Sequence, residues 1–195
     1  MAVNLTKGQK ISLTKENSGL KNIIVGLGWD EAKAKFSLFK KPEPIDCDAS
    51  AIMCKQGGKF FGKEDLVYFG KLRHKSGSVV HKGDNLTGAG DGDDEQIAVS
   101  LANVPAEYTK IVFVVNIFEA EVRKQNFGMI ENAFVHVFDS DTGTELCRYN
   151  LSDNYNGKTS LICAELVKNG SQWDFTAVGE GTNDLSIHTL ASKYI

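Results

Sequence analysis

The sequence predicts an all-β fold, either a sandwich or a barrel. Short runs rich in β-branched and aromatic residues follow one another along most of the chain, and clusters of Gly, Asn, Asp and Ser separate them. Only the two chain ends and one connecting segment depart from this pattern. The runs are QKISL, KNIIVGLGW, IDCDASAIMCK, DLVYFGKL, SVVHK, EQIAVSL, KIVFVVNIF, AFVHVFD, TELCRYNL, TSLICAELVK and WDFTAVGE.

Two of these runs indicate how the strands are covered. Ile97, Val99 and Leu101 alternate with polar or small residues, as expected of a strand that has one face on a core. The run 111–115 is apolar on both faces, as expected of a strand covered on both sides. We therefore expect 111–115 to form a central strand.

Turn residues predict two hairpins, and the chain is expected to end in a helix. The sequences DSDTG (139–143) and KNGSQ (168–172) each place Gly or Asn where a positive φ is needed. Asp139 and Asp141 are accordingly interpreted as turn residues. The helix is predicted over 184–195, with three apolar residues roughly on one face: Leu185, Leu190 and Ile195.

Length and composition favour a single domain, residues 1–195. A chain with 42% hydrophobic and 24% charged residues can bury a sizeable core. The net charge of −3 provides no basic field, so we expect no nucleic acid partner. The N-terminal run lacks the apolar stretch of a signal peptide, which predicts a cytoplasmic protein. Four cysteines without CxxC spacing predict unpaired, buried thiols: Cys47, Cys54, Cys147 and Cys163.

The segment GDNLTGAGDGDDEQ (83–96) carries five carboxylates and four glycines. Two carboxylates about 5 Å apart repel each other by roughly 3 kcal/mol at an effective dielectric constant of 20. Such a segment either stays hydrated, as runs of like charge usually do, or holds a cation. Interleaved Gly and Asn and a strand directly after the segment favour the cation.

The chemistry of the segment indicates calcium. Ca²⁺ takes six to eight oxygen ligands in flexible geometry, and the segment contains no nitrogen or sulfur ligand that would favour zinc or copper. Its oxygen-bearing side chains are Asp84, Asn85, Asp91, Asp93, Asp94 and Glu95. In an extended segment Asp93 and Glu95 would share one face and Asp94 the other, a spacing that could serve two adjacent ions. The spacing matches neither an EF-hand nor a P-loop.

A second acidic cluster lies upstream in IDCDAS (45–50). Alternation would place Asp46 and Asp48 on one face of a strand and send Ile45 and Cys47 into the core. If this strand ends beside the downstream segment, the two acids complete the oxygen cage; otherwise they are surface residues of an edge strand. Asp30 is a reserve ligand.

At these residues the chain resembles the TerD family of bacterial tellurium-resistance and stress proteins. The resemblance covers nearly the whole chain and rests on GLGWD, the D-x-D-A-S of 46–50, GSVVHKGDNLTGAGDGDDE, VPAEYTKIVFVV, RKQNFG, RYNLSD and WDFTAVGEG. It implies a two-sheet antiparallel β-sandwich with short helical segments, with calcium held between loops at one end, and a link to tellurite resistance. The family's ligands fall on Asp46, Asp48, Asp84, Asn85, Asp91, Asp93, Asp94 and Glu95. One departure is Pro44, which stands where members often carry a further acid.

We therefore expect a non-enzymatic module that binds one or two Ca²⁺ ions. One alternative is a metal-assisted phosphoester hydrolase, for which His81, close to the acidic segment, is the histidine to test. Another is calcium-dependent docking to a membrane surface through the basic stretch 71–77 and Lys82. Other stress-resistance proteins are further candidate partners.

The stretch RKQNFG (123–128) leaves two interpretations open. As a loop between strands it could bind a partner. Alternatively, Phe127 fills the core while Gln125 and Asn126 satisfy backbone groups of the loop.

Overall fold

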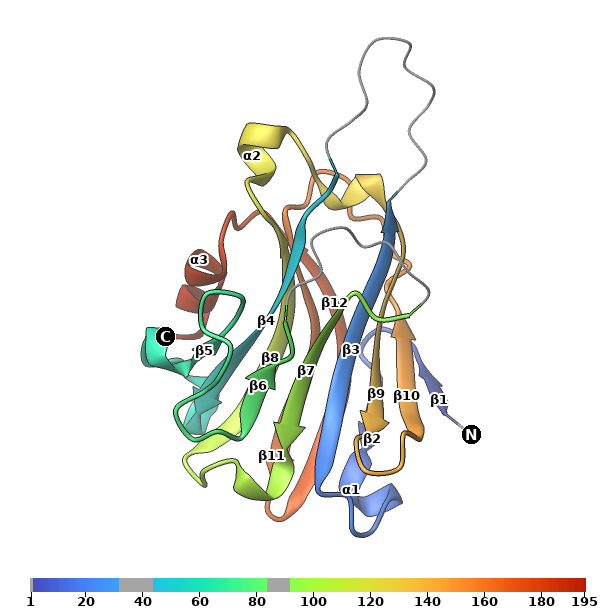
Figure 1. Ribbon diagram of the computed structural model, residues 1–195, viewed down its shortest axis with the longest axis vertical. Helices are drawn as coiled ribbons and strands as arrows, with labels where there is room; N and C mark the ends of the chain where they lie inside the picture. The colour runs from blue at the N-terminus through green and yellow to red at the C-terminus, as the bar shows by residue number, and fades with distance from the viewer. Residues whose placement is uncertain (1, 32–43, 84–91) are drawn as a thin grey trace.

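A computed structural model describes residues 2–31, 44–83 and 92–195, and it places two β-sheets face to face (Figure 1). Within these residues sheet A has the order β1 (Val3–Leu5), β10 (Glu145–Asn150), β9 (Ile130–Asp139), β3 (Asn22–Glu31), β7 (Glu95–Ser100) and β6 (Val79–His81). Sheet B has the order β2 (Lys10–Ser12), β12 (Gln172–Thr182), β11 (Ser160–Asn169), β8 (Tyr108–Ile117), β4 (Cys47–Lys55) and β5 (Leu66–Val67). The fold is therefore a sandwich. Its pairs are antiparallel except β1 with β10, which run parallel.

The helices are short and lie outside the two sheets. They are α1 (Leu13–Glu16), α2 (Ala120–Arg123) and α3 (Ile187–Ala191). Single 3₁₀ turns span Gln56–Gly58, Lys63–Asp65, Leu101–Asn103, Phe127–Met129 and Ser192–Tyr194. In the described part of the chain, none of these helices has the length and apolar character needed to cross a membrane.

The core follows the predicted alternation. Ile97, Val99 and Leu101 are buried, whereas the residues between them are partly exposed, although Leu101 already belongs to a 3₁₀ turn. All of 111–115 is buried on β8, which lies between β11 and β4 as expected of a central strand. One face of β8 packs on the core between the sheets, and the other packs beneath α3.

Both predicted hairpins are present. Gly143, between β9 and β10, has a φ of 71°, and Gly170, between β11 and β12, has a φ of 62°. Asp139 accepts hydrogen bonds from the Asp141 amide and the Thr142 hydroxyl, each at 2.9 Å. The interpretation of this pair of acids as turn residues is thus confirmed.

The predicted face of the C-terminal helix is wrong. Leu190 is buried, but Leu185 is 48% exposed and Ile195 is 76% exposed. The helix begins only at Ile187, after an N-cap at Ser186, and a 3₁₀ turn replaces it from residue 192. A continuous 3.6-residue period therefore does not extend over 184–195, and the residues buried beside Leu190 are Ile187 and Ala191.

One feature of sheet B positions the acidic residues. The short strand β5 pairs with β4 only at Ala51 and Ile52, so it leaves the start of β4 uncovered on that side. There the backbone of Ala49 bonds to side chains from sheet A, from β6 and β7. The start of β4 and the start of β7 therefore meet across the open edge of the sandwich.

Candidate metal centre

The upstream acids lie where alternation predicts them. Ile45 and Cys47 are buried in the core between the sheets. Asp48 lies on the opposite face of β4 and is only 7% exposed, and Asp46, just before the strand, is partly exposed. The backbone carbonyl of Asp46 accepts a hydrogen bond from the Phe118 amide at 2.8 Å, which fixes the segment against the end of β8.

Glu95 enters the interior between the two sheets. Its carboxylate is fully buried, and its Oε2 accepts a hydrogen bond from the backbone amide of Ala49 on β4. The Nε2 atom of His81 on β6 lies 3.4 Å from the same oxygen. Glu95 thus links the first residue of β7 to the uncovered edge of β4.

Asp94 is held at the end of β3. It is 8% exposed, its Oδ2 accepts a hydrogen bond from the Trp29 amide at 2.7 Å, and its own amide donates to the Leu27 carbonyl at 2.9 Å. Burial raises the pKa of Asp94, and the negative charges of Asp30 and Asp93 add to this, while the Trp29 amide acts in the opposite direction. The raised pKa therefore reflects burial first, and the two neighbouring negative charges contribute less.

Asp93 does not share a face with Glu95, and that prediction is wrong. Asp93 lies on the outer face of sheet A, where Oδ1 bonds to His136 and Oδ2 accepts a hydrogen bond from the Gln96 side chain at 2.9 Å. Glu95, by contrast, points into the sandwich. The two-residue period holds only inside a strand, and β7 begins at Glu95, after a bend. The spacing argument for two adjacent ions falls with this prediction.

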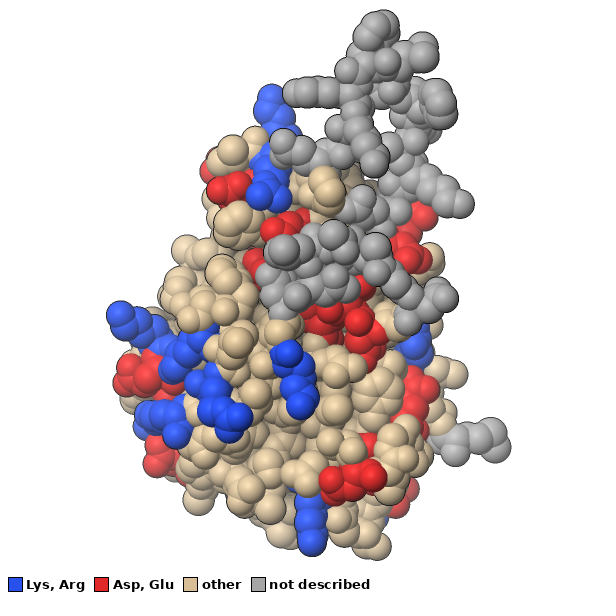
Figure 2. All heavy atoms as spheres, in the orientation of Figure 1, with Lys and Arg blue, Asp and Glu red and all other residues tan. Residues whose placement is uncertain are grey.

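The two acidic clusters meet around Cys47. Burial raises the pKa of its thiol well above the usual value, and the charges of Asp48, Asp46, Glu95 and Asp94 raise it further, in that order. The charges of all four carboxylates therefore act on one buried thiol, although their positions span about a quarter of the chain. On the face shown in Figure 2, Asp and Glu atoms gather near the ends of β3, β4 and β7, and Lys and Arg atoms gather around β5.

A complete ligand set is not present in the described ranges. No group of three His, Cys, Asp or Glu side chains within residues 2–31, 44–83 and 92–195 is arranged to hold a metal ion. Asp84, Asn85 and Asp91, three of the predicted ligands, lie outside the described residues. Asp30, the reserve ligand, is exposed and accepts a hydrogen bond from the Asn132 side chain at 2.8 Å.

His81 is built into the sandwich. Its side chain is fully buried, Nδ1 accepts a hydrogen bond from the Gly83 amide at 3.2 Å, and Nε2 donates to the Ala49 carbonyl at 3.1 Å. This pattern requires the neutral ring with its proton on Nε2. Each ring nitrogen therefore forms a hydrogen bond to the backbone beside the acidic residues.

His136 is bonded to the acidic segment, a link that the sequence alone does not reveal. It lies on the outer face of β9 between two carboxylates, with Asp93 at Nε2 and Glu145 at 2.9 Å from Nδ1. Burial would lower the pKa of His136, but the hydrogen bonds to Asp93 and Glu145 outweigh burial and raise the pKa. The available signal was its alternation with the buried Val135 and Val137.

The four cysteines are unpaired and buried, as predicted. Burial raises the pKa of Cys54, Cys147 and Cys163 to about 12. Thiols with such pKa values stay protonated near neutral pH, and a protonated thiol is a poor nucleophile. These side chains therefore act as small apolar residues of the core.

The segment 123–128 secures the chain next to the site, which confirms the second interpretation of RKQNFG. Phe127 is 5% exposed and belongs to the core. The side-chain Oδ1 of Asn126 accepts hydrogen bonds from the amides of Gly128 at 2.9 Å and Gly157 at 3.0 Å. Gln125 donates to the Pro44 carbonyl at 3.2 Å, directly before the upstream acids.

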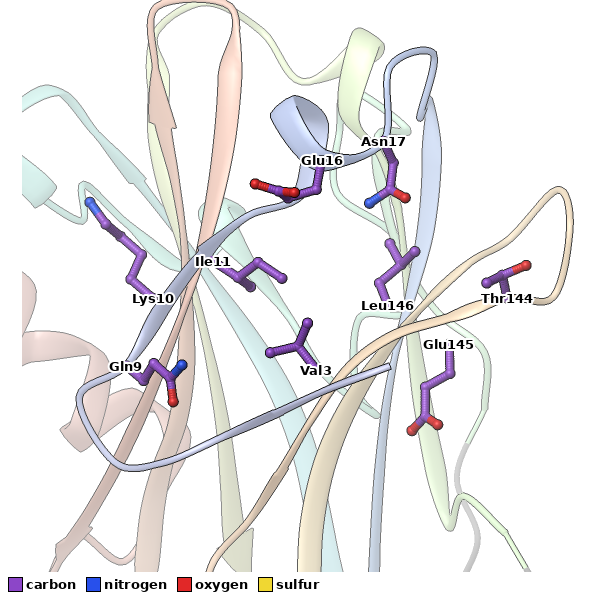
Figure 3. Close-up of a pocket in the computed structure, with 9 residues that line it drawn as sticks. All are labelled: Val3, Gln9, Lys10, Ile11, Glu16, Asn17, Thr144, Glu145 and Leu146. Carbon is purple, nitrogen blue, oxygen red and sulfur yellow. The ribbon is translucent and has the colours of Figure 1, made fainter. Parts of the chain in front are cut away.

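A cavity of about 410 Å³ lies away from these acids, at the mouth between β1, β2, α1 and β10 (Figure 3). Val3, Ile11 and Leu146 give it apolar walls. The remaining lining residues are Gln9, Lys10, Glu16, Asn17, Thr144 and Glu145. Lys10 is 3.4 Å from Asp174 and Glu145 is bound to His136, so this mixed lining defines no single ligand chemistry.

The two sheets and the acids at one open edge define the class of this protein, which is a β-sandwich with a candidate cation site. A family model described as the TerD domain matches residues 1–194, and the chain belongs to the TerD family.

Curated relatives carry names from stress response and tellurium resistance. The chain is 51% identical to "Stress response protein SCP2" of Bacillus subtilis over the whole of both proteins. It is 44% identical to "General stress protein 16U" of the same organism, over 93% of this chain and 91% of the relative. It is 41% identical to "Tellurium resistance protein TerD" of Serratia marcescens, with the same two coverages.

A solved structure supports the fold. A homologue of telluride resistance protein (TerD) from Streptomyces coelicolor A3(2) aligns with a TM-score of 0.67 at 22% identity, over 89% of this chain and 96% of that one.

Proposed function

We propose that this protein is a non-enzymatic stress-response protein that binds calcium and contributes to resistance against tellurite and other toxic agents. The stress role is supported by family membership and by the names of relatives that are 41% to 51% identical over nearly the whole chain. The cytoplasmic location expected from the sequence belongs to the same proposal. Cell fractionation with an antibody against the protein tests the location.

The calcium site is supported by the hydrogen bond from the Ala49 amide to Glu95, which joins the two acidic segments. The negative charges of Asp46, Asp48, Asp94 and Glu95 also act together on the Cys47 thiol. These four acids lie in or directly before β4 and β7, one strand from each sheet. They supply only oxygen, the ligand that calcium prefers. Gathering like charges at a buried edge costs free energy, and a divalent cation offsets that cost. In this proposal Asp84, Asn85 and Asp91 complete the coordination.

Asp93 takes a different part in the proposal. Its carboxylate bonds to His136 and Gln96 on the outer face of sheet A. We assign it a positioning role, in which it holds the start of the acidic segment on the sheet. From this part of the segment, the bound ion would then be held by Asp94 and Glu95 and not by Asp93.

Calorimetric titration of metal-stripped protein tests the site. Calcium should bind the wild-type protein, and Asp48→Asn or Asp94→Asn should weaken binding by more than about tenfold. Asp174→Asn is the matched control, because Asp174 is as buried as Asp48, at 7% exposure, but lies on β12 towards the opposite edge of sheet B. Absence of binding at millimolar calcium, with magnesium and zinc also inactive, would refute the proposal.

Growth in the presence of tellurite tests the stress role separately. A strain that lacks the gene should become sensitive, and the wild-type gene should restore growth. Restoration by Asp48→Asn at equal protein level would show that the role does not depend on the proposed calcium site. Failure of the wild-type gene to restore growth would remove the tellurite role and leave calcium binding untouched.

The hydrolase alternative finds no support at His81, whose ring nitrogens both bond to the backbone. A panel of phosphoester substrates tests it directly. Turnover that disappears in His81→Ala would favour the hydrolase over the binding module.

Docking to an anionic membrane surface is a second candidate function, because apolar side chains are exposed near the basic stretch. Phe61 is 67% exposed, Phe69 is 46% exposed and Leu72 is 45% exposed. Arg73 and Lys75 in the same region are also exposed. Sedimentation with phosphatidylserine vesicles, with and without calcium, tests this function, and unchanged sedimentation would exclude it.

A further inference from the structure

Arg148 on β10 carries a guanidinium group that is fixed in place on the outer face of sheet A. Its Cζ atom lies 3.7 Å from the centre of the Phe134 ring, and its Nε donates a hydrogen bond to the Asn150 side chain at 3.1 Å. The ring and this hydrogen bond together restrict the plane of the guanidinium. An arginine held in this way loses little conformational freedom when it binds a ligand.

The charge of Arg148 has no carboxylate partner within the ranges that the structure describes. Arg123, in contrast, lies 3.2 Å from Glu119 and 4.0 Å from Asp46. Lys7, which borders the neighbouring surface, is paired with Asp153 at 2.5 Å. Arg148 therefore presents its terminal nitrogens as donors, with a positive charge that the described residues do not pair.

These donors border a cavity of suitable chemistry. The cavity has a volume of about 450 Å³ and is lined by Asn132, Ala133, Arg148, Asn150, Leu151 and Ser152. The lining contains one cation, two side-chain amides and one hydroxyl, and it contains no carboxylate. A second cavity of about 340 Å³ shares Arg148, Asn150 and Ser152 with it.

We propose that this cavity binds a small oxyanion, with Arg148 as the charged ligand and Asn132, Asn150 and Ser152 as hydrogen-bonding partners. Guanidinium groups bind carboxylate and phosphate oxygens through two parallel hydrogen bonds, and amide and hydroxyl donors complete such sites. Free phosphate, a carboxylate metabolite and tellurite share this chemistry. The site lies outside the proposed calcium ligands and does not depend on calcium binding.

Asp30 lies beside the lining and sets the sign of a second test. Asp30 accepts a hydrogen bond from the side chain of Asn132 at 2.8 Å. Its negative charge next to the lining lowers the affinity for any anion. Replacing Asp30 with asparagine should therefore strengthen binding, whereas replacing Arg148 should weaken it.

Nuclear magnetic resonance titration of the full-length protein tests the proposal, with phosphate, acetate and tellurite as separate probes at constant ionic strength. Shifts of the side-chain signals of Arg148 and Asn150 should saturate with at least one probe, and the probe bound most tightly identifies the source. Arg148→Gln should reduce the affinity by about tenfold or more, and Arg148→Lys by less, since lysine keeps the charge but loses the paired geometry. Asp30→Asn should bind more tightly than the wild-type protein.

Arg73→Gln is the matched control, because Arg73 is an exposed arginine that lines neither cavity. Its affinity should equal that of the wild-type protein. An equal loss of affinity in Arg73→Gln and Arg148→Gln would show that only the net charge of the protein matters, and it would overturn the proposal. Absence of saturation with every probe at about 20 mM, well above the weak millimolar range, would also overturn it. If Arg148→Gln fails to fold, Arg148→Lys and Asp30→Asn still decide, because their effects have opposite signs.

Discussion

The carboxylate of Asp93 lies directly over the backbone of Gly26 on the outer face of sheet A. A Cβ atom at Gly26 would collide with this carboxylate, and a Cβ atom at Gly28 would collide with the ring of Phe134. The two glycines of GLGW thus let side chains from other segments cross β3. The motif is therefore explained by close approach to the strand and requires no special backbone angle.

Replacing Gly26 with alanine should displace Asp93 from His136 and lower the free energy of unfolding by about 2 kcal/mol, within the range for overpacking. Urea denaturation measures the loss. Gly62→Ala is the matched control, because its backbone is also extended and its new Cβ would lie 3.6 Å from Glu64, an ordinary contact. Equal stability of the two variants would contradict this account of the motif.

Outside the candidate metal centre, Asp65 is the acid whose contribution to stability should depend most clearly on pH. Its Oδ1 accepts a hydrogen bond from the Tyr108 hydroxyl at 2.6 Å and lies 3.5 Å from His74 Nε2 and 3.4 Å from Lys75 Nζ. Burial acts to raise the pKa of Asp65, but the bonds from Tyr108, His74 and Lys75 outweigh it, so the pKa falls below its usual 3.8.

Asp65→Asn should therefore lower the free energy of unfolding by about 2 kcal/mol at pH 7. A lowered pKa stabilises the fold above the unfolded-state value of 3.8, and this stabilisation is lost as the pH falls through the folded-state pKa. The difference between variant and wild type should shrink below that pH in urea titrations. Asp153→Asn, which breaks an exposed ion pair, should cost less than about 1 kcal/mol at either pH. A constant Asp65→Asn deficit down to pH 2 would be inconsistent with the lowered pKa.

Phe127→Ala should lower the free energy of unfolding by about 3 to 4 kcal/mol, because it removes a buried aromatic ring and leaves a cavity. Phe61→Ala serves as the control, since 67% of that residue is exposed. Thermal and urea unfolding of both variants provide the comparison. A loss of stability no larger than that of Phe61→Ala would contradict the assignment of Phe127 to the core.

The four thiols should not react with a thiol reagent in the folded protein at pH 8. All four are buried, and burial raises each pKa far above that pH. Absorbance with Ellman's reagent should rise to four equivalents only after denaturant is added. Rapid reaction of one thiol in the native state would reopen a redox role.

The burial pattern of two strands could be predicted from the sequence because each signal was local. Alternation at 97–101 and the apolar run at 111–115 depend only on neighbouring residues, and both predictions are confirmed. The burial of Ile45 and Cys47 opposite Asp48 was predicted for the same reason.

The details of the site required tertiary contacts that no local pattern contains. The bend before Glu95 separates it from Asp93, and the partner that fixes Asp93 is His136, which is 43 residues away. The Ala49 amide donates a hydrogen bond to Glu95, and this contact could not be predicted without knowing that β5 is short. The start of the C-terminal helix was likewise set by the cap at Ser186 and could not be read from apolar spacing alone.

The central claim is that a hard divalent cation joins the acids at the edge between β4 and β7. A crystal structure of the protein grown with calcium at about 5 mM, a level that fills even the weaker class of calcium sites, tests it most directly. We predict a density peak coordinated only by oxygen, at 2.3 to 2.6 Å from ligands that include Asp48 and Asp94. Well-ordered acids at this edge, with no such peak between them, would contradict the claim.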